Sequence, residues 1–319
     1  MLKVVFLGTP QIAVNSVMKL LNFSDIHIVG IVTQPDRPAG RGKKLLEPPV
    51  KVCAVENSIP LYQTVSIRKD VELISELKKL EPDFFITFAF GQILSQEVLD
   101  IPKIATINLH ASLLPKYRGA NPIQRAIYNG DFETGITTMI TVLGLDAGDI
   151  CLTEKIKITN GMTSPQLAEI ISEKAPFLLY RTLKGLSSQT LIPEPQDESL
   201  VTFANKFSKE DGLIVWNKTS IEIHNQVRSL LDWPCAYTKF DSKLVKIIET
   251  QIVEKDIDFS GYSSGQVVSI KKSEGVYVKT SDSVILVTKV KPESKSCMSA
   301  YDWSNGVKLK IGMNFDGGF

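Results

Sequence analysis

The sequence lacks the cysteine spacing and the long apolar run that identify many metalloproteins and membrane proteins at first sight. Its four cysteines, Cys53, Cys151, Cys235 and Cys297, form no CxxC pair, so the common zinc sites are unsupported and reduced thiols are expected. The longest strongly apolar segment, 84–90, is far shorter than the ~20 residues that a membrane span needs. These absences favour a metal-free, cytoplasmic protein that does not enter a membrane.

Net charge is close to zero and histidine is rare. The 36 basic and 35 acidic residues leave a formal charge of +1, so the whole chain does not indicate a polyanionic partner, although a local basic patch is still possible. Only three histidines are present: His27 in an early strand pattern, His110 after a later one, and His224 on a helical pattern. We interpret His27 and His224 as structural or solvent-facing, which leaves His110 as the leading acid-base candidate.

The first part of the chain alternates between strand and helix patterns. Apolar runs at 4–7, 27–33, 84–90 and 105–109 are separated by helical patterns at 12–21, 48–55 and 70–80. This alternation predicts an α/β fold with a Rossmann-like, mostly parallel sheet, whose ligands bind beyond the carboxyl ends of the strands. A further strand is expected at 135–142, and a helix from 163 to about 185 that Pro176 should kink or split.

The pattern of predicted elements changes after a proline-containing, polar stretch at 187–199, which has the composition of a linker. Beyond it lie a helical pattern at 219–231 and five short strand patterns, at 237–240, 245–248, 266–270, 276–280 and 284–290. Short strands at this spacing predict a small β-barrel. The expected domains are therefore 1–189, which would be catalytic, a linker at 190–205, and a second domain at 206–319.

Asn108 and His110 lie two residues apart at the carboxyl end of a predicted strand. Side chains at this spacing share one face of a strand, so both would point into the crevice where a ligand is expected. An amide that donates to a developing oxyanion and an imidazole that moves a proton suit acyl transfer to an amine. An equally consistent interpretation is a polar strand end whose side chains are satisfied by backbone groups.

A carboxylate is expected to support the imidazole, and the segment 143–149 offers Asp146 and Asp149. A carboxylate beside an imidazole favours its charged form and can hold a water for proton transfer. Spacing does not choose between the two aspartates. The simpler interpretation of the segment is a glycine turn capped by aspartate.

These residues, with the Ser112–Pro115 run, Arg118-Gly119 and the LDAGD segment, resemble the 10-formyltetrahydrofolate-dependent formyltransferases. The resemblance implies that the catalytic trio is Asn108, His110 and Asp146, choosing Asp146 over Asp149, and that 10-formyltetrahydrofolate is the formyl donor. It also implies an OB-like fold for the C-terminal barrel. The folate-binding residues that it implies are Ser112, Leu113, Leu114, Pro115, Phe88 and Gly91.

A second motif bears on the acceptor of the formyl group. From residue 33 to residue 51, five basic residues stand against two acidic ones in a loop rich in glycine and proline, which could grip phosphates. A solvated charged loop is the alternative. The loop resembles that of the family branch that acts on initiator methionyl-tRNA in support of translation initiation, and the match to its important arginine is Arg41. The residues expected to contact tRNA are Arg37, Arg41, Lys43 and Lys44.

Two other hypotheses remain open at the level of sequence. The acceptor could be a small amine such as an amino sugar, or the chain could be a non-catalytic RNA-binding protein built on the same scaffold. Asn121 departs from the small residue expected beside the Arg-Gly-Ala segment, and the C-terminal region is not strongly basic. By resemblance we expect a monomer.

Overall fold

The structure of the 319-residue chain is a computed structural model that describes residues 1–39, 44–253 and 257–315. The chain forms two compact units. Unit 1 comprises Met1–Pro122, Thr134–Lys157 and Ala168–Ala204, and unit 2 comprises Ile123–Glu133, Ile158–Leu167 and Asn205–Phe319. A search of the described ranges finds no helix that is both long enough and apolar enough to cross a membrane.

A seven-stranded sheet forms the centre of unit 1, in the order β10-β9-β7-β6-β1-β2-β5. Its strands are β1 (Leu2–Gly8), β2 (Ile26–Thr33), β5 (Leu61–Gln63), β6 (Phe84–Phe88), β7 (Ala105–His110), β9 (Glu133–Ile140) and β10 (Ile150–Lys157). The five strands from β5 to β7 run parallel, whereas β9 runs antiparallel to β7. The mostly parallel α/β sheet expected from the sequence is therefore confirmed, with an antiparallel strand that the sequence pattern does not reveal.

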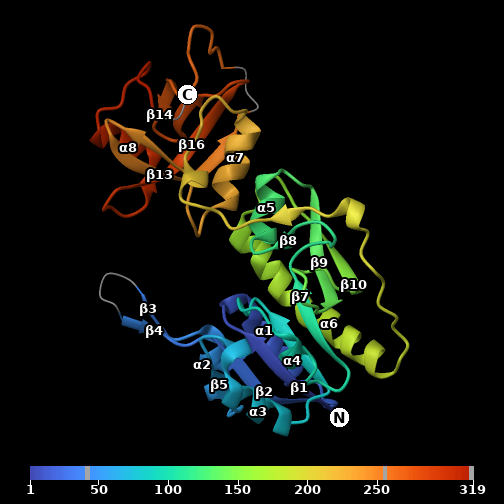
Figure 1. The fold of residues 1–319 in the computed structure, drawn as a ribbon. Helices are drawn as coiled ribbons and strands as arrows, with labels where there is room; N and C mark the ends of the chain where they lie inside the picture. Colours follow the sequence, from blue (N-terminus) through green and yellow to red (C-terminus); the bar gives the residue numbers. More distant parts are fainter. Residues whose placement is uncertain (40–43, 254–256, 316–319) are drawn as a thin grey trace. The chain divides into compact units, whose positions relative to one another are not determined.

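Helices cover this sheet (Figure 1). They are α1 (Gln11–Leu20), α2 (Pro49–Glu56), α3 (Val71–Lys79), α4 (Gln96–Leu99) and α6 (Ser164–Ser187), whereas α5 (Pro122–Tyr128) belongs almost entirely to unit 2. Asp70 caps the start of helix α3, since its carboxylate accepts a hydrogen bond from the Leu73 amide at 3.1 Å, and the helix packs Leu77 against Val5 and Leu7 of β1. Apolar residues three to four apart thus bury one face of the helix.

Helix α6 is not split at Pro176, contrary to the stronger form of the sequence prediction. Proline removes one backbone hydrogen bond, but the helix is held by side chains on both sides of it. Ala175 and Leu178 are fully buried, and the Thr182 hydroxyl lies 2.7 Å from that of Thr138 in β9. Packing against the sheet therefore outweighs the local cost of the proline.

Four short strands and three short 3-10 helices lie in the connecting segments within the two units. They are β3 (Arg37–Ala39), β4 (Lys44–Leu46), β8 (Arg118–Gly119), β11 (Phe203–Ala204), η1 (Ile67–Lys69), η2 (Glu198–Leu200) and η3 (Glu210–Gly212). Strands β8 and β11 pair in parallel, and β3 and β4 form an antiparallel ribbon. The β8–β11 pairing brings the stretch expected to be a linker against the segment that follows His110.

Unit 2 is built around an antiparallel sheet in the order β12-β13-β16-β15-β14, with β17 beside β16. Its elements are α7 (Ser220–Ser229), β12 (Tyr237–Phe240), β13 (Lys243–Ile252), β14 (Val267–Lys271), β15 (Gly275–Lys279), β16 (Val284–Pro292), β17 (Met298–Ser299) and α8 (Ala300–Gly306). Trp216, Trp303 and Phe315 stack in its core, with ring centroids 5.4 to 5.7 Å apart. The predicted order, an α/β part followed by a smaller part built on short antiparallel strands, is confirmed.

His224 on α7 gives unit 2 a predicted dependence of stability on pH. Its Nδ1 lies 2.9 Å from the Thr250 hydroxyl and its Nε2 2.9 Å from the carbonyl of Asn160, and burial, with a smaller effect of Arg228, lowers the His224 pKa below its ordinary 6.5. The unfolded chain then binds the proton more tightly, so stability is complete above about pH 6.5 and decreases as the pH falls toward the lowered pKa.

This pH effect is measured by urea unfolding of the wild type and His224→Gln at about pH 7.5 and about pH 5.5, on either side of the ordinary histidine pKa of roughly 6.5. The unfolding free energy of the wild type is expected to fall more than that of the variant, by at most about 1.4 kcal/mol per pH unit. Equal losses in the two proteins would contradict the assignment.

Candidate active site

Strand β7 places Asn108 and His110 on one face of the sheet, as their spacing predicts. The register of the sheet pairs Asn108 with Thr87 of β6, and the Thr87 hydroxyl donates to Asn108 Oδ1 at 2.8 Å. Because this bond occupies the amide oxygen, the amide nitrogen of Asn108 is left to donate away from Thr87. It lies 3.3 Å from Asp146 Oδ1.

The imidazole of His110 is buried, with about 5% of the residue exposed. Its Nε2 lies 2.8 Å from the carbonyl oxygen of Tyr117, which can only accept, so this nitrogen carries a hydrogen. Its Nδ1 lies 3.6 Å from Asp146 Oδ2, beyond direct hydrogen-bond distance. Nδ1 is therefore the position at which a proton can be taken up or released, beside a carboxylate.

Asp146 reaches the other two residues from a loop between β9 and β10. Its Oδ2 accepts a hydrogen bond from the Gly119 amide at 2.8 Å, and its backbone is left-handed, with φ of +47°. Asp149, which spacing alone left equal to Asp146, is exposed in the same loop. The structure thus brings Asn108, His110 and Asp146 together, as the resemblance implied.

The position of Asp146 has a different physical origin from that expected. Because β9 is antiparallel, its last residue, Ile140, pairs with Ile107 and lies near the beginning of β7. The loop must then fold back along β7 to reach His110. The rule that ligands gather at carboxyl ends accounts for Asn108 and His110, but the contacts of the loop account for Asp146.

The segment after β7 is held by a hydrogen bond of its own and by two to Thr137 of β9. The buried Ser112 hydroxyl donates to the Lys116 carbonyl at 2.6 Å, and the Ser112 carbonyl accepts from Thr137 at 2.7 Å. Leu114 is also buried, and its amide donates to the Thr137 hydroxyl at 3.1 Å. Of the four residues expected to bind folate here, Leu113 and Pro115 are the two with partly exposed surfaces.

The loop after β6 contains the other two residues expected to bind folate. Phe88 is in the core, with 2% of the residue exposed, which leaves it almost no surface for contact with a ligand. Gly91 is exposed and left-handed, with φ of +76°, and a Cβ there would lie 2.6 Å from the Gln34 amide nitrogen. Gln34 donates to the carbonyl of Phe90 at 2.9 Å and so fixes this loop.

The basic loop is described only at its base. Arg41 and Lys43 lie outside the described residues, Lys44 belongs to β4, and Arg37 in β3 donates to Gln34 Oε1 at 2.6 Å. At the base, Lys51 pairs with Asp36 at 2.6 Å and with Glu47 at 2.8 Å. These bonds raise the Lys51 pKa and, together with Gln63, lower that of Asp36. The positive charge of the loop is therefore carried by residues 37–44, which hold four basic residues and no acidic ones.

Gln196 is a contact residue of the site that sequence reasoning missed. Its amide nitrogen donates to the carbonyl oxygens of Asp146 at 2.8 Å and Gly148 at 2.7 Å. It belongs to the polar, proline-containing stretch that composition assigns to a linker, and a glutamine there carries no signal by itself. Only the fold brings it to Asp146, 50 residues earlier in the chain.

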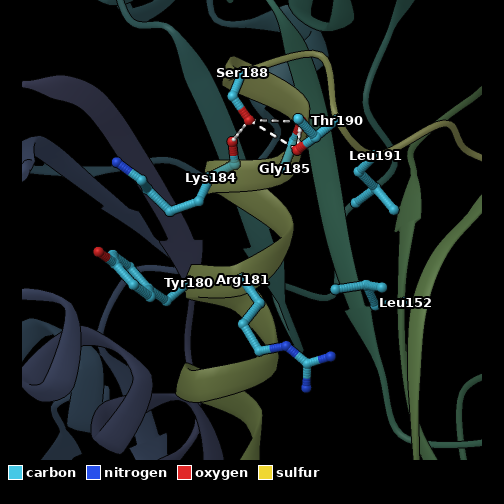
Figure 2. Close-up of a pocket in the computed structure, with 8 residues that line it drawn as sticks. All are labelled: Leu152, Tyr180, Arg181, Lys184, Gly185, Ser188, Thr190 and Leu191. Carbon is cyan, nitrogen blue, oxygen red and sulfur yellow. Dashed lines mark hydrogen bonds between the residues drawn. The ribbon is translucent and has the colours of Figure 1, made fainter.

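A hollow of about 410 Å³ lies elsewhere in unit 1, around the end of α6 (Figure 2). The hydroxyls of Ser188 and Thr190 lie 2.9 Å apart, and they donate to the carbonyls of Lys184 and Gly185 respectively, which caps the end of the helix. No residue that lines this hollow belongs to the trio or its loops. Within the described part of the chain, no group of three or more histidine, cysteine, aspartate or glutamate residues could hold a metal ion.

Two protein-family models match the chain. The model described as "Formyl transferase" matches residues 2–183, and "Formyl transferase, C-terminal domain" matches residues 206–308. A methionyl-tRNA formyltransferase of Clostridium acetobutylicum is 43% identical over 313 residues, covering 98% of this chain and 99% of that protein. One from Clostridium perfringens is 42% identical over 311 residues, with the same coverage.

Solved structures agree with this assignment at the level of the fold. The sugar 3N-formyl transferase WlaRD, solved in the presence of dTDP and 5-N-formyl-THF, superposes with a TM-score of 0.65 over 93% of this chain and 99% of its own. Its sequence identity is 21%, so the likeness carries the fold alone. From the family match across residues 2–183 and relatives more than 40% identical along nearly the whole chain, this protein belongs to the formyl transferase family.

Proposed function

We propose that this chain transfers the formyl group of 10-formyltetrahydrofolate to the α-amino group of methionine on initiator methionyl-tRNA, in support of translation initiation. The observation that carries the proposal is the meeting of Asn108, His110 and Asp146 in a chain 43% identical to a methionyl-tRNA formyltransferase over nearly its full length. An amide donor, an imidazole and a carboxylate are the groups that acyl transfer to an amine requires.

The bonds of the trio suggest a role for each member. Nε2 of His110 is committed to the Tyr117 carbonyl, so Nδ1 exchanges the proton, 3.6 Å from Asp146 Oδ2, a distance that can tighten to hydrogen-bond length when substrate binds. Asp146 stabilises the imidazolium, and the Asn108 amide donates to the carbonyl oxygen on which charge develops. Burial of His110 keeps bulk water from competing for the proton.

Exposed apolar side chains in the loops that follow β6 and β9 would suit the flat, partly apolar ring system of a folate. Leu143 and Leu145, in the loop that carries Asp146, are 62% and 63% exposed, and Ile93, after β6, is 68% exposed. Large apolar side chains left in water beside polar groups are typical of a ligand site. When bound, the folate supplies an activated formyl group, and these loops would hold its rings.

The donor and the acceptor are tested together by incubating the purified chain with formyl-labelled 10-formyltetrahydrofolate and charged initiator methionyl-tRNA. Label is expected in tRNA, and after hydrolysis of the ester it should be recovered as N-formylmethionine. If the label remains in folate or is released as formate, the proposal is wrong.

Arg41→Leu is expected to lower kcat/KM for tRNA at least tenfold and to weaken its dependence on salt, because a lost phosphate contact releases fewer counterions. Arg68→Leu, at an exposed arginine of the same unit, is the matched control and should leave both quantities unchanged. A small-amine acceptor predicts instead that the two variants behave alike. That outcome would contradict a role of the basic loop in binding tRNA.

Several less direct features complete the proposal. We infer domains at 1–189 and 206–319 joined by a linker at 190–205, a division that the family matches at 2–183 and 206–308 support. We further infer a cytoplasmic monomer that works without a metal. Folate binding at Ser112, Leu113, Leu114, Pro115, Phe88 and Gly91, and tRNA binding at Arg37, Arg41, Lys43 and Lys44, belong to the same proposal.

A further inference from the structure

Gln196 contacts the backbone of the loop that carries Asp146 with both hydrogens of its amide group. The carbonyl oxygens of Asp146 and Gly148 accept these bonds at 2.8 and 2.7 Å. On its other side, the amide oxygen of Gln196 accepts two bonds from Arg118, from Nε at 3.0 Å and from Nη2 at 2.9 Å. One side chain therefore joins a buried arginine to the Asp146 loop.

The chemistry of the partners fixes the orientation of the Gln196 amide. A guanidinium can only donate, and backbone carbonyls can only accept, so the oxygen must face Arg118 and the nitrogen must face the loop. Arg118 is itself 4% exposed and is held from outside by Glu198, at 2.7 Å. Its neighbour Gly119 supplies the amide that binds Asp146 Oδ2. The carboxylate of Asp146 is thus held by Gly119, and its backbone is held by Gln196, which is bonded to the adjacent Arg118.

The loop needs such support because of its backbone. Asp146 is left-handed, a conformation that a residue other than glycine keeps only where its surroundings require it. At Gly148, a Cβ would collide with the carbonyl of Ile140, so the loop lies directly against the end of β9. The two hydrogen bonds from Gln196 hold the backbone at both of these constrained residues, Asp146 and Gly148.

We propose that Gln196 is a positioning residue of the formyl transfer, which sets Asp146 in register with His110 by holding the backbone of its loop. The inference rests on the proposed function, because it concerns the same trio. A shift of about 1 Å in a catalytic group costs about 100-fold in rate. Loss of the two carbonyl bonds is therefore expected to lower kcat by 10- to 100-fold, on the order that such a displacement implies, and to change KM little.

Two replacements of Gln196 separate positioning from structural support. Gln196→Glu keeps an acceptor toward Arg118 but presents an oxygen to the two loop carbonyls. It therefore loses the hydrogen bonds to the loop and retains those to the arginine. Gln196→Met has a similar length and loses both sets of bonds. Positioning predicts that both variants lose a similar factor in kcat, whereas the melting temperature falls clearly only in Gln196→Met. A purely structural role predicts that activity follows the melting temperature.

The experiment measures kcat, KM and melting temperature of the full chain with both substrates. Gln189→Glu, which adds the same charge at an exposed glutamine nearby, is the matched control and should behave as the wild type. Wild-type kcat in Gln196→Glu would overturn the positioning role while leaving the proposed function intact. Asp146→Asn is run beside it, because wild-type kcat in that variant would remove Asp146 from the catalytic trio, whereas no formyl transfer by the wild type would overturn the proposed function.

Discussion

His110→Ala is expected to lower kcat by about 100- to 10,000-fold, the range that a positioned acid-base group contributes. Among the described residues, His110 is the only imidazole within 4 Å of a carboxylate, with Nδ1 3.6 Å from Asp146 and Nε2 held by the Tyr117 carbonyl. Alanine leaves no group there that can take the proton of the attacking amine. Single-turnover measurements should show the loss in the chemical step.

The control for this prediction is His27→Ala, at an exposed position in β2. It makes the same chemical change in the same unit and should leave kcat at the wild-type value. The fold of His110→Ala is checked by its melting temperature. A well-folded His110→Ala variant with near-normal kcat would remove His110 from the catalytic trio.

Asn108→Ala is expected to lower kcat by about 100- to 1,000-fold, the usual effect of removing one donor to a developing oxyanion. The Thr87 hydroxyl holds the amide oxygen at 2.8 Å, so the amide nitrogen is aimed before any substrate binds. KM should change little, because the donor acts where charge develops rather than on the bound ground state.

Asn217→Ala, at an exposed asparagine of unit 2, provides the matched control. Asn108→Asp adds a further check, since it keeps the size of the side chain but offers no amide hydrogen. Both variants at 108 should therefore lose activity, whereas Asn217→Ala should not. A loss confined to KM would mean that Asn108 binds substrate equally in the ground and transition states.

Local sequence patterns predict the parts of the fold that local physics determines. The apolar run of β1 and the apolar stripe of α3 are determined by neighbours in the sequence, and both are present as expected. The spacing of Asn108 and His110 likewise fixes their shared face, because side chains alternate along a strand.

Contacts between distant segments explain what the sequence does not predict. The direction of β9, the edge strand β10 and the short helix α8 depend on tertiary pairing or packing, and none was expected. Asp146 is positioned by Gly119, 27 residues earlier, and by Gln196, 50 residues later. Only the family resemblance chose it over Asp149, since spacing contains no information on these partners.

The acceptor is tested most directly by offering three amines to the enzyme in one mixture. Charged initiator methionyl-tRNA, charged elongator methionyl-tRNA and an amino sugar nucleotide compete for formyl-labelled 10-formyltetrahydrofolate, and the labelled products are separated. The account predicts that nearly all the label enters initiator methionyl-tRNA, and that Arg41→Leu reduces this product. Preferential labelling of the amino sugar, or equal labelling of the two tRNAs, would contradict it.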